Sequence, residues 1–295
     1  MGFFGSSLAQ IPDLTGKVAL VTGANTGMGY TIAEQLAIHG AKVFMGARSE
    51  EKAKQAIAKF NTEHQNTPDK GDIVWLPLDL THPADVAASA KSFLSQVDRL
   101  DILASAYSLT RDGIETLVAT NHIGHFVLTE ALLPLLRQTA QLPGSDVRVV
   151  TVSSDLHTYV KDIQLETKAD LNKPFSADPA TNDGLLATTK RYNLTKLLNV
   201  LFASELQRRA DQEAFIKPGL RWFGKTPEQG AESALFAATS PEVRAKAEKY
   251  KGSYLGPGGK LSLASETGRD GKLAQNLWTL SEKTVHDILG EKGAL

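Results

Sequence analysis

A glycine-rich turn between an apolar run and an amphipathic pattern is the feature that most constrains this chain. Residues 18–21 form a short apolar run typical of a buried strand, and after the turn the apolar residues recur at helical spacing. Glycines let the backbone approach a pyrophosphate closely, and the first N–H groups of the helix point at the phosphates. We therefore predict a dinucleotide-binding unit, with a ligand-free turn as the alternative; its predicted contacts are Gly23, Asn25, Thr26, Gly27, Met28 and Gly29.

The rest of the chain alternates strand and helix patterns. We expect strands at 41–46, 73–78, 100–104 and 147–152, and helices at 50–63, 83–97, 121–141, 188–209 and 273–289. This alternation implies an α/β fold, a doubly wound parallel sheet of the Rossmann type with helices on both faces. The predicted organisation is an N-terminal arm at 1–13, a single dinucleotide-binding and catalytic domain at 14–240, and a tail at 241–295 that closes the substrate side.

Composition excludes several classes of function. The 295 residues carry a formal net charge of −1, which supplies no basic field for nucleic acid. The chain has no cysteine and therefore neither disulfides nor thiolate metal sites. No apolar run approaches the length of a membrane span, and residues 1–13 lack the charged segment of a signal peptide. We expect a cytoplasmic protein without stable membrane insertion.

The end of the second strand indicates which dinucleotide is bound. In this kind of fold an acidic residue there bonds the ribose 2′-hydroxyl, whereas a nearby cation accommodates a 2′-phosphate. The chain has Arg48 at this position and no carboxylate, which favours NADP(H) over NAD(H). The alternative is that Arg48 is only a solvated charge at the start of the next helix. Asp79 and Leu80 follow the third strand at the same sheet edge and are predicted to meet the adenine, although Asp79 could equally cap the next turn.

A tyrosine and a lysine on one helix form the candidate chemical centre. Tyr192 and Lys196 are four residues apart and therefore share a helix face. A phenol is a poor acid or base at neutral pH, but an adjacent ammonium favours the phenolate and lowers the phenol pKa. The spacing by itself is a weak signal, and the alternative is a helix tyrosine with a solvated hydroxyl.

Other polar residues are expected at the same edge. The run Thr151-Val152-Ser153-Ser154 places hydroxyls at the carboxyl end of the fifth strand, and Asn121-His122 opens the long central helix. In open α/β sheets, ligands bind at the carboxyl ends of the strands. These residues and Tyr192 are therefore predicted to meet there. Because strand residues alternate faces, only one of Ser153 and Ser154 can point into the site.

Together these motifs resemble the short-chain dehydrogenase/reductase family. The resemblance rests on the glycine pattern, the Asn-His-Ile-Gly-His-Phe run from Asn121, the Ser-Ser pair and the sequence Tyr192-Asn193-Leu194-Thr195-Lys196. It covers residues 14 to about 210. Within the family, the sequence is most similar to the retinol-dehydrogenase-like reductases and to the related fungal carbonyl reductases. The resemblance implies an oxidoreductase that transfers a hydride between NADP(H) and a carbonyl or alcohol carbon.

The resemblance also implies a role for each catalytic residue. Tyr192 would be the general acid in reduction and the base in oxidation, and Lys196 would hold the nicotinamide ribose and lower the Tyr192 pKa. Ser154, chosen over Ser153 on the family's pattern, would bind the substrate oxygen, and Asn121 would place a water in the proton relay. Positioned donors of this kind stabilise the charge that develops on oxygen.

The spacing of the histidines in this region does not predict a metal site. His122, His125 and His157 lack a further ligand at a recognisable spacing, so we expect helix-surface or loop hydrogen bonding instead. The two long apolar helices, beginning near Asn121 and Thr188, are by family resemblance candidate faces for a homodimer.

Two segments depart from the family pattern. After the fourth strand the family has an Asn-Asn-Ala-Gly turn, but this chain reads Ala104-Ser105-Ala106-Tyr107-Ser108. Between Arg209 and Pro218-Gly219 there is hardly room for the sixth strand that precedes the family's nicotinamide-binding Pro-Gly motif. A poorly held nicotinamide would slow hydride transfer, because a misplacement of about 1 Å can cost roughly a hundredfold in rate.

Three functions therefore stand as hypotheses. The first is an NADP(H)-dependent carbonyl reductase or alcohol dehydrogenase acting on a small, moderately apolar aldehyde, ketone or secondary-metabolite carbonyl. The second is a dinucleotide-binding protein with little or no turnover, and the third is an epimerase or dehydratase on the same fold.

Overall fold

A computed structural model describes residues 11–105, 115–176, 185–212, 221–222 and 227–290. The replaced turn at Ala106–Ser108 and the Pro218-Gly219 motif lie outside these described residues. Within them, no helix combines the length and the apolar character needed to cross a bilayer.

One sheet of eight strands organises the molecule, in the order β3-β2-β1-β4-β5-β6-β7-β8. Strands β1 to β7 are parallel and β8 is antiparallel to β7. In register, Val21 lies beside Met45 on one side and Ala104 on the other. The strands are β1 (Val18–Thr22), β2 (Lys42–Ala47), β3 (Ile73–Pro77), β4 (Ile102–Ser105), β5 (Arg148–Val152), β6 (Arg221–Trp222), β7 (Tyr254–Leu255) and β8 (Leu261–Ser262).

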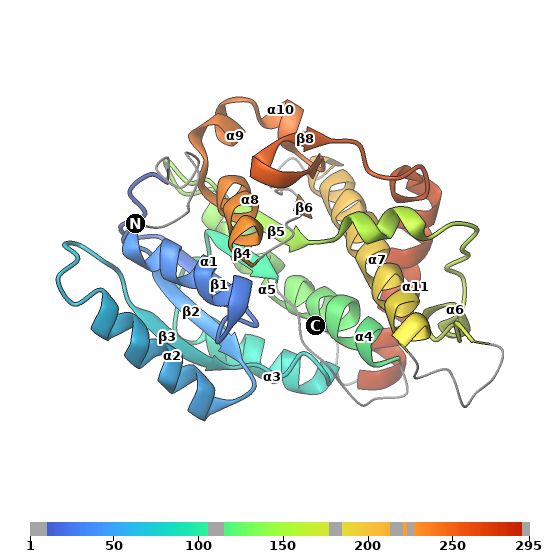
Figure 1. The fold of residues 1–295 in the computed structure, drawn as a ribbon, viewed down its shortest axis with the longest axis horizontal. Helices are drawn as coiled ribbons and strands as arrows, with labels where there is room; N and C mark the ends of the chain where they lie inside the picture. Colours follow the sequence, from blue (N-terminus) through green and yellow to red (C-terminus); the bar gives the residue numbers. More distant parts are fainter. Residues whose placement is uncertain (1–10, 106–114, 177–184, 213–220, 223–226, 291–295) are drawn as a thin grey trace.

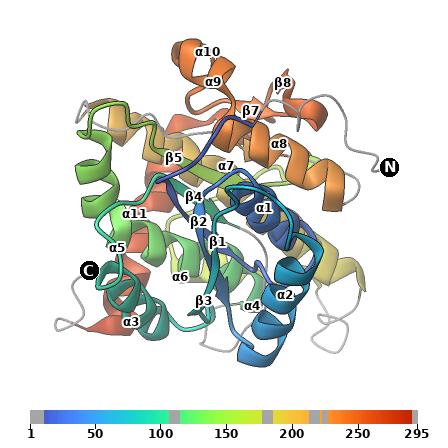
Figure 2. The same ribbon diagram turned by 90° about the vertical axis from the view of Figure 1, so that its left-hand side faces the viewer.

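Helices cover both faces of the sheet, as the alternating pattern predicts (Figure 2). The main helices are α1 (Gly27–Ile38), α2 (Glu50–Glu63), α3 (Pro83–Leu94), α5 (Gly124–Ala140), α7 (Leu185–Gln212), α8 (Pro227–Thr239) and α11 (Gly271–Leu289). The short helical segments are α4 (Thr116–Val118), η2 (Ala119–Ile123), η3 (Asp155–Tyr159), α6 (Lys168–Leu171), α9 (Pro241–Ala245), α10 (Ala247–Tyr250), η5 (Pro257–Gly259) and η6 (Thr267–Arg269).

Two apolar cores lie on opposite faces of the sheet because strand side chains alternate. Val18 and Leu20 pack with α3, α5, α7 and α11, whereas Ala19 and Val21 pack with α1, α2 and α8. The central strands are therefore apolar on both faces, as buried parallel strands require. The doubly wound α/β fold predicted from the sequence is confirmed.

The end of the chain belongs to the same sheet. Strands β7 and β8 extend the sheet beyond β6, and α11 packs against α7 in Figure 1. A sixth strand is present, but it follows the Pro218-Gly219 motif instead of preceding it: Arg221–Trp222 pairs in parallel with β5. This strand has only two residues, and periodicity cannot reveal so short a segment.

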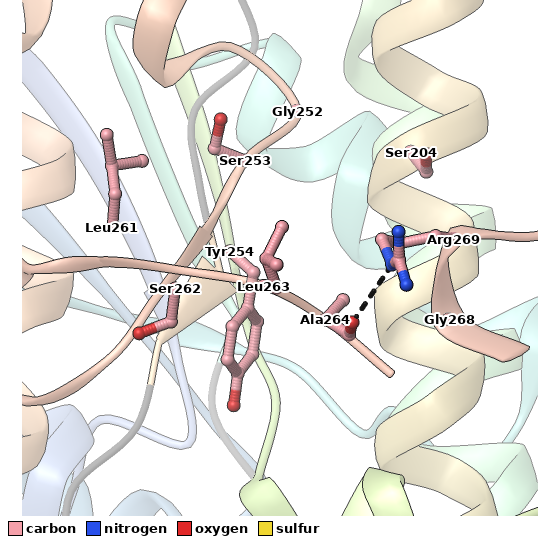
Figure 3. Close-up of a pocket in the computed structure, with 10 residues that line it drawn as sticks. All are labelled: Ser204, Gly252, Ser253, Tyr254, Leu261, Ser262, Leu263, Ala264, Gly268 and Arg269. Atoms are coloured by element: carbon pink, nitrogen blue, oxygen red, sulfur yellow. Dashed lines mark hydrogen bonds between the residues drawn. The ribbon is translucent and has the colours of Figure 1, made fainter. Parts of the chain in front are cut away.

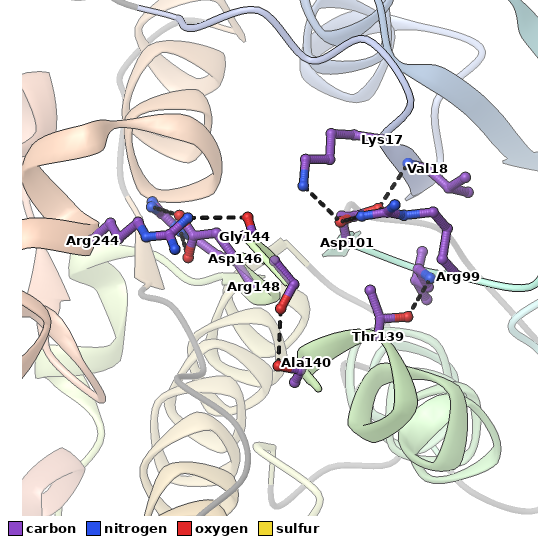
Figure 4. A network of polar contacts seen from close by, with 12 residues as sticks. Lys17, Val18, Arg99, Asp101, Thr139, Ala140, Gly144, Asp146, Arg148 and Arg244 are labelled. Atoms are coloured by element: carbon purple, nitrogen blue, oxygen red, sulfur yellow. Dashed lines mark hydrogen bonds and ion pairs between the residues drawn. The ribbon is translucent and has the colours of Figure 1, made fainter. Parts of the chain in front are cut away.

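The amino ends of the strands are held by buried charges (Figure 4). Asp101, just before β4, accepts hydrogen bonds from Arg99 and from the Val18 backbone N–H and pairs with Lys17. Arg148, at the start of β5, pairs with Asp146 and donates to the carbonyls of Ala237 and Ser240. These contacts fix the edge of the sheet opposite to the predicted site.

Candidate active site

The glycine turn after β1 is shaped to receive a ligand. Gly23 and Gly27 both have positive φ, and a Cβ on Gly29 would collide with the carbonyl of Gly23. A Cβ on Gly27 would instead meet nothing within 4 Å, so this glycine borders open space. Thr26 makes no side-chain cap to α1, which leaves the first amides of the helix for an anion. The turn therefore fits a dinucleotide diphosphate.

A hollow of about 490 Å³ opens beside this turn, between α1 and α2. Asn25, Thr26 and Gly27 line one side of it, and Lys52 and Lys59 line the other. Met28 is half-buried and packs against Val152 at the end of β5. Lys52 was not predicted as a contact, although it shares one face of α2 with Gln55, Ala56 and Lys59 and this spacing is visible in the sequence.

The residues predicted to choose the dinucleotide lie at the carboxyl edge of the sheet. Arg48 is exposed and directly follows β2. Asp79 is half-buried and accepts a hydrogen bond from the Thr81 N–H at 3.0 Å, so the alternative of a turn cap is realised. Leu80 is buried, and a Cβ on Gly124 would collide with its carbonyl, so the loop after β3 is pressed against the start of α5. Adenine contacts from Asp79 and Leu80 stay predictions.

Tyr192 and Lys196 lie together on α7, as their spacing requires. The Lys196 ammonium is 5.2 Å from the centre of the Tyr192 ring and 3.4 Å from the Val152 carbonyl at the end of β5. Burial lowers the pKa of Lys196 to about 8. At pH 7 the side chain is therefore still mostly charged and favours ionisation of the neighbouring phenol.

The two serines after β5 have different surroundings. The Ser153 hydroxyl is buried and donates to the Lys196 carbonyl at 2.6 Å, which joins β5 to α7. Ser154 is only half-buried and begins η3, where its hydroxyl accepts a long bond of 3.4 Å from the Leu156 N–H. The Ser153 hydroxyl therefore serves to join β5 to α7, and the Ser154 hydroxyl is the more accessible of the two for binding a substrate oxygen.

Asn121 lies in a π-helical turn, η2, and not in the first turn of a regular helix. Its side-chain nitrogen donates to the Thr195 hydroxyl at 3.0 Å, and that hydroxyl donates to the Tyr192 carbonyl at 2.8 Å. The other amide atom, Oδ1, is buried without a protein partner. A buried acceptor of this kind is expected to hold a water molecule. Single π-helical turns are frequent at functional sites.

Three histidines near this centre make hydrogen bonds, and His122 and His125 are buried instead of lying on the helix surface as the sequence suggested. His122 bonds Ser281 of α11 at 2.8 Å, and burial lowers its pKa to about 3. His125 lies 3.0 Å from the Thr22 hydroxyl at the head of the glycine turn. His157 bonds the Ser154 carbonyl and the Ser265 N–H. These long-range partners were not readable from the sequence.

A second hollow, of about 430 Å³, lies away from these residues. It is lined by the β7–β8 hairpin, η6 and Ser204 of α7 (Figure 3). The guanidinium of Arg269 there donates to the Ala264 carbonyl. None of the predicted catalytic residues lines this hollow.

Comparison with known proteins agrees with this geometry. The family model described as short chain dehydrogenase matches residues 17–161. The "Short chain dehydrogenase/reductase dpchH" of Colletotrichum higginsianum is 42% identical over 309 aligned residues, covering 94% of this chain and 77% of the relative. The "Short chain dehydrogenase/reductase dpfgH" of Gibberella zeae is 37% identical, covering 94% of this chain and 84% of the relative. A solved structure of an uncharacterized protein from Mycobacterium paratuberculosis matches with 29% identity and a TM-score of 0.70, covering 97% of this chain and 98% of that one.

Proposed function

Because this chain belongs to the short-chain dehydrogenase/reductase family of oxidoreductases, which bind a nicotinamide dinucleotide, we propose that it is an NADP(H)-dependent carbonyl reductase or alcohol dehydrogenase. Its substrate is a small, moderately apolar aldehyde, ketone or secondary-metabolite carbonyl, or the corresponding alcohol. We place the activity in the cytoplasm.

One observation carries the proposal. The charged amine of Lys196 lies buried beside the ring of Tyr192, at the carboxyl end of β5. NADPH held by the glycine turn after β1 would supply the hydride, and negative charge would then develop on the substrate oxygen. Tyr192 donates a proton to that oxygen, and Ser154 donates a hydrogen bond that orients it. Asn121 holds a water that returns a proton toward Lys196 and Tyr192, and its unsatisfied Oδ1 supports this role.

The experiment combines cofactor binding with turnover. NADPH binding is followed by fluorescence titration, and turnover by the fall in NADPH absorbance with a panel of aldehydes and ketones. Tyr192→Phe removes the acidic hydroxyl and should lower kcat at least a hundredfold while NADPH affinity stays within about twofold. The matched control is Tyr250→Phe, which removes the hydroxyl that bonds Glu242 on α9.

Two results would contradict the proposal. Full turnover in Tyr192→Phe would remove this residue from the chemistry. Tight NADPH binding without turnover of any carbonyl in the wild-type chain would favour a dinucleotide-binding protein with little or no catalysis. The observation that favours this second function is that β6, beside the predicted nicotinamide region, has only two residues.

Preference for NADPH rests on the cations at the end of β2 and the start of α2. Arg48 follows the strand, and Lys52 lines the hollow beside the glycine turn. Arg48→Ala should weaken NADPH about tenfold to a hundredfold and leave NADH within about threefold, because only NADPH carries the 2′-phosphate. Lys54→Ala is the control, since Lys54 is an exposed cation on α2, close to Arg48 in sequence, and pairs with Glu50. Equal losses for NADPH and NADH would contradict the assignment.

A further inference from the structure

His157 joins two segments that are far apart in the sequence. It lies in η3, three residues after Ser154, and its side chain has no exposed surface. Nδ1 is 2.7 Å from the Ser154 carbonyl, and Nε2 is 3.0 Å from the Ser265 backbone nitrogen. The ring thus spans from the predicted substrate-binding serine to the segment before η6.

These partners determine the state of the imidazole. The Ser265 N–H is a donor, so Nε2 must be the unprotonated acceptor. The proton of a neutral ring then lies on Nδ1 and is donated to the Ser154 carbonyl, which also accepts the His157 backbone N–H at 2.9 Å. Each ring nitrogen is therefore used in a contact that only this tautomer makes.

A second contact joins η3 to strand β7, which precedes the segment 264–269 in the chain. The Tyr254 hydroxyl of β7 donates to Asp155 at 3.2 Å, and the Tyr254 ring lies 5.1 Å from the His157 ring. Tyr254 and Val152 form a small apolar cluster against which Ala264 packs. Figure 3 shows Tyr254 and Ala264 among the residues that line the second hollow. On the other side, Ser265 accepts the Gly268 N–H through its hydroxyl and so orders the turn into η6.

We propose that His157 is a positioning residue whose Nδ1 hydrogen bond holds Ser154 in its working orientation, while its Nε2 contact with Ser265 ties the ring to the segment 264–269. This inference rests on the proposed function, in which the Ser154 hydroxyl orients the substrate oxygen. Nδ1 sets the peptide group of Ser154, and Nε2 fixes the ring that carries Nδ1. Rates are sensitive to such placement, because about 1 Å of error at a reacting group costs roughly a hundredfold.

Three substitutions separate the two ring contacts. His157→Asn keeps a donor near the position of Nδ1, His157→Gln keeps an acceptor near the position of Nε2, and His157→Phe keeps the ring against Tyr254 but makes neither bond. We expect kcat to fall about tenfold to a hundredfold in His157→Phe and His157→Gln and less than about fivefold in His157→Asn. NADPH affinity should stay within about twofold in all three variants.

Hydrogen exchange tests the connection without relying on turnover. In His157→Phe, or in His157→Asn if the Phe variant does not fold, amides in 264–269 should exchange faster, since the Ser265 N–H loses its acceptor. A residue with a purely structural role would lower the melting temperature without separating the Asn from the Gln variant in kcat.

The inference is overturned if His157→Gln turns over within twofold of wild type, or if exchange in 264–269 is unchanged in both His157→Phe and His157→Asn. A wild-type chain that reduces no carbonyl would overturn the proposed function and the positioning role together. The exchange measurement would then still decide whether His157 ties the two segments.

Discussion

The ammonium group of Lys196 is buried against the end of β5, with only 4% of the residue exposed. Burial lowers its pKa from 10.5 to about 8, so below pH 8 the folded protein holds a charge that water would solvate better. This charge opposes folding and at the same time supports the predicted acidity of Tyr192. The catalytic role proposed for Lys196 and the stability of the fold are therefore in conflict at this residue.

Replacing Lys196 by Met should make the protein more stable and inactive. The lowered pKa corresponds to a cost of about 3 kcal/mol at pH 7, part of which the variant recovers. From pH 8 to about 10.5 the unfolded chain binds more protons at this residue than the folded one, so the wild-type stability rises with pH relative to the variant. Urea unfolding of both proteins without cofactor, from pH 7 to 10, measures this difference.

The expected result is an advantage for Lys196→Met at pH 7 that shrinks toward pH 10, together with a loss of turnover of at least a hundredfold. A variant that is less stable than wild type at pH 7 would show that the Lys196 contacts outweigh the burial of its charge. Asn199 donates to the same Val152 carbonyl at 2.9 Å, so this acceptor stays satisfied in the variant.

At the scale of the elements, the sequence predicted the parts with strong periodicity. Strands β1 to β5, and helices α2, α7 and α11, lie within a few residues of their expected positions because each buries a regular apolar face. The π-helical form of η2 was not predictable, since an inserted residue in a helix leaves no change in apolar spacing that one sequence reveals. The pairing of β6 depends on neighbouring strands and not on its own two residues.

For the candidate site, the sequence predicted which residues lie at the carboxyl edge but not how they are held. The motif around Tyr192 and Lys196 could be read because both residues share one helix face. The links from Asn121 to Thr195 and from His157 to Ser265 join residues 74 and 108 positions apart, and such contacts follow from tertiary structure alone.

The amino edge of the sheet depends on Asp101, which is 1% exposed. Its carboxylate binds Arg99 through two bonds of 2.8 and 2.7 Å and accepts the N–H of Val18 at the start of β1. Asp101→Ala should lower the free energy of unfolding by about 3 kcal/mol, because a buried N–H and a half-buried guanidinium lose their partner. Urea unfolding provides the measurement.

Lys17→Met is the control for this prediction. It removes a single ion pair of 3.4 Å from a partly exposed lysine and should cost less than about 1 kcal/mol. Similar losses in Asp101→Ala and Lys17→Met would contradict the importance of the buried carboxylate. Neither variant should change NADPH affinity, since both lie at the opposite edge of the sheet from the glycine turn.

At the scale of the whole molecule, α11 changes the expectation for oligomeric state. The two long helices α5 and α7 were candidate faces for a homodimer, but α11 packs along α7 and its Trp278 reaches Phe126 of α5. Trp278 of α11 stacks on Phe202 of α7 at 5.7 Å and meets Phe126 of α5 edge-on at 5.0 Å. His122 bonds Ser281 beside this aromatic cluster. The chain thus covers this apolar surface with its own helix.

We predict that the protein does not dimerise through α5 and α7. Light scattering during gel filtration should give the mass of one chain, 31.8 kDa, over a tenfold range of concentration. A dimer whose Trp278→Ala variant dissociates would contradict this prediction. A dimer that withstands the substitution would place the interface on another surface.

The central claim is that Tyr192, supported by Lys196, donates the proton to a substrate that accepts a hydride from bound NADPH. A crystal structure of the protein with NADP⁺ tests it most directly. We expect the diphosphate against the glycine turn, the nicotinamide ribose within about 2.6–3.2 Å of the Lys196 amine, and the nicotinamide ring on the side of the Tyr192 hydroxyl. A nicotinamide ring that lies outside the space bounded by Ser154, Tyr192 and Lys196 would contradict the account.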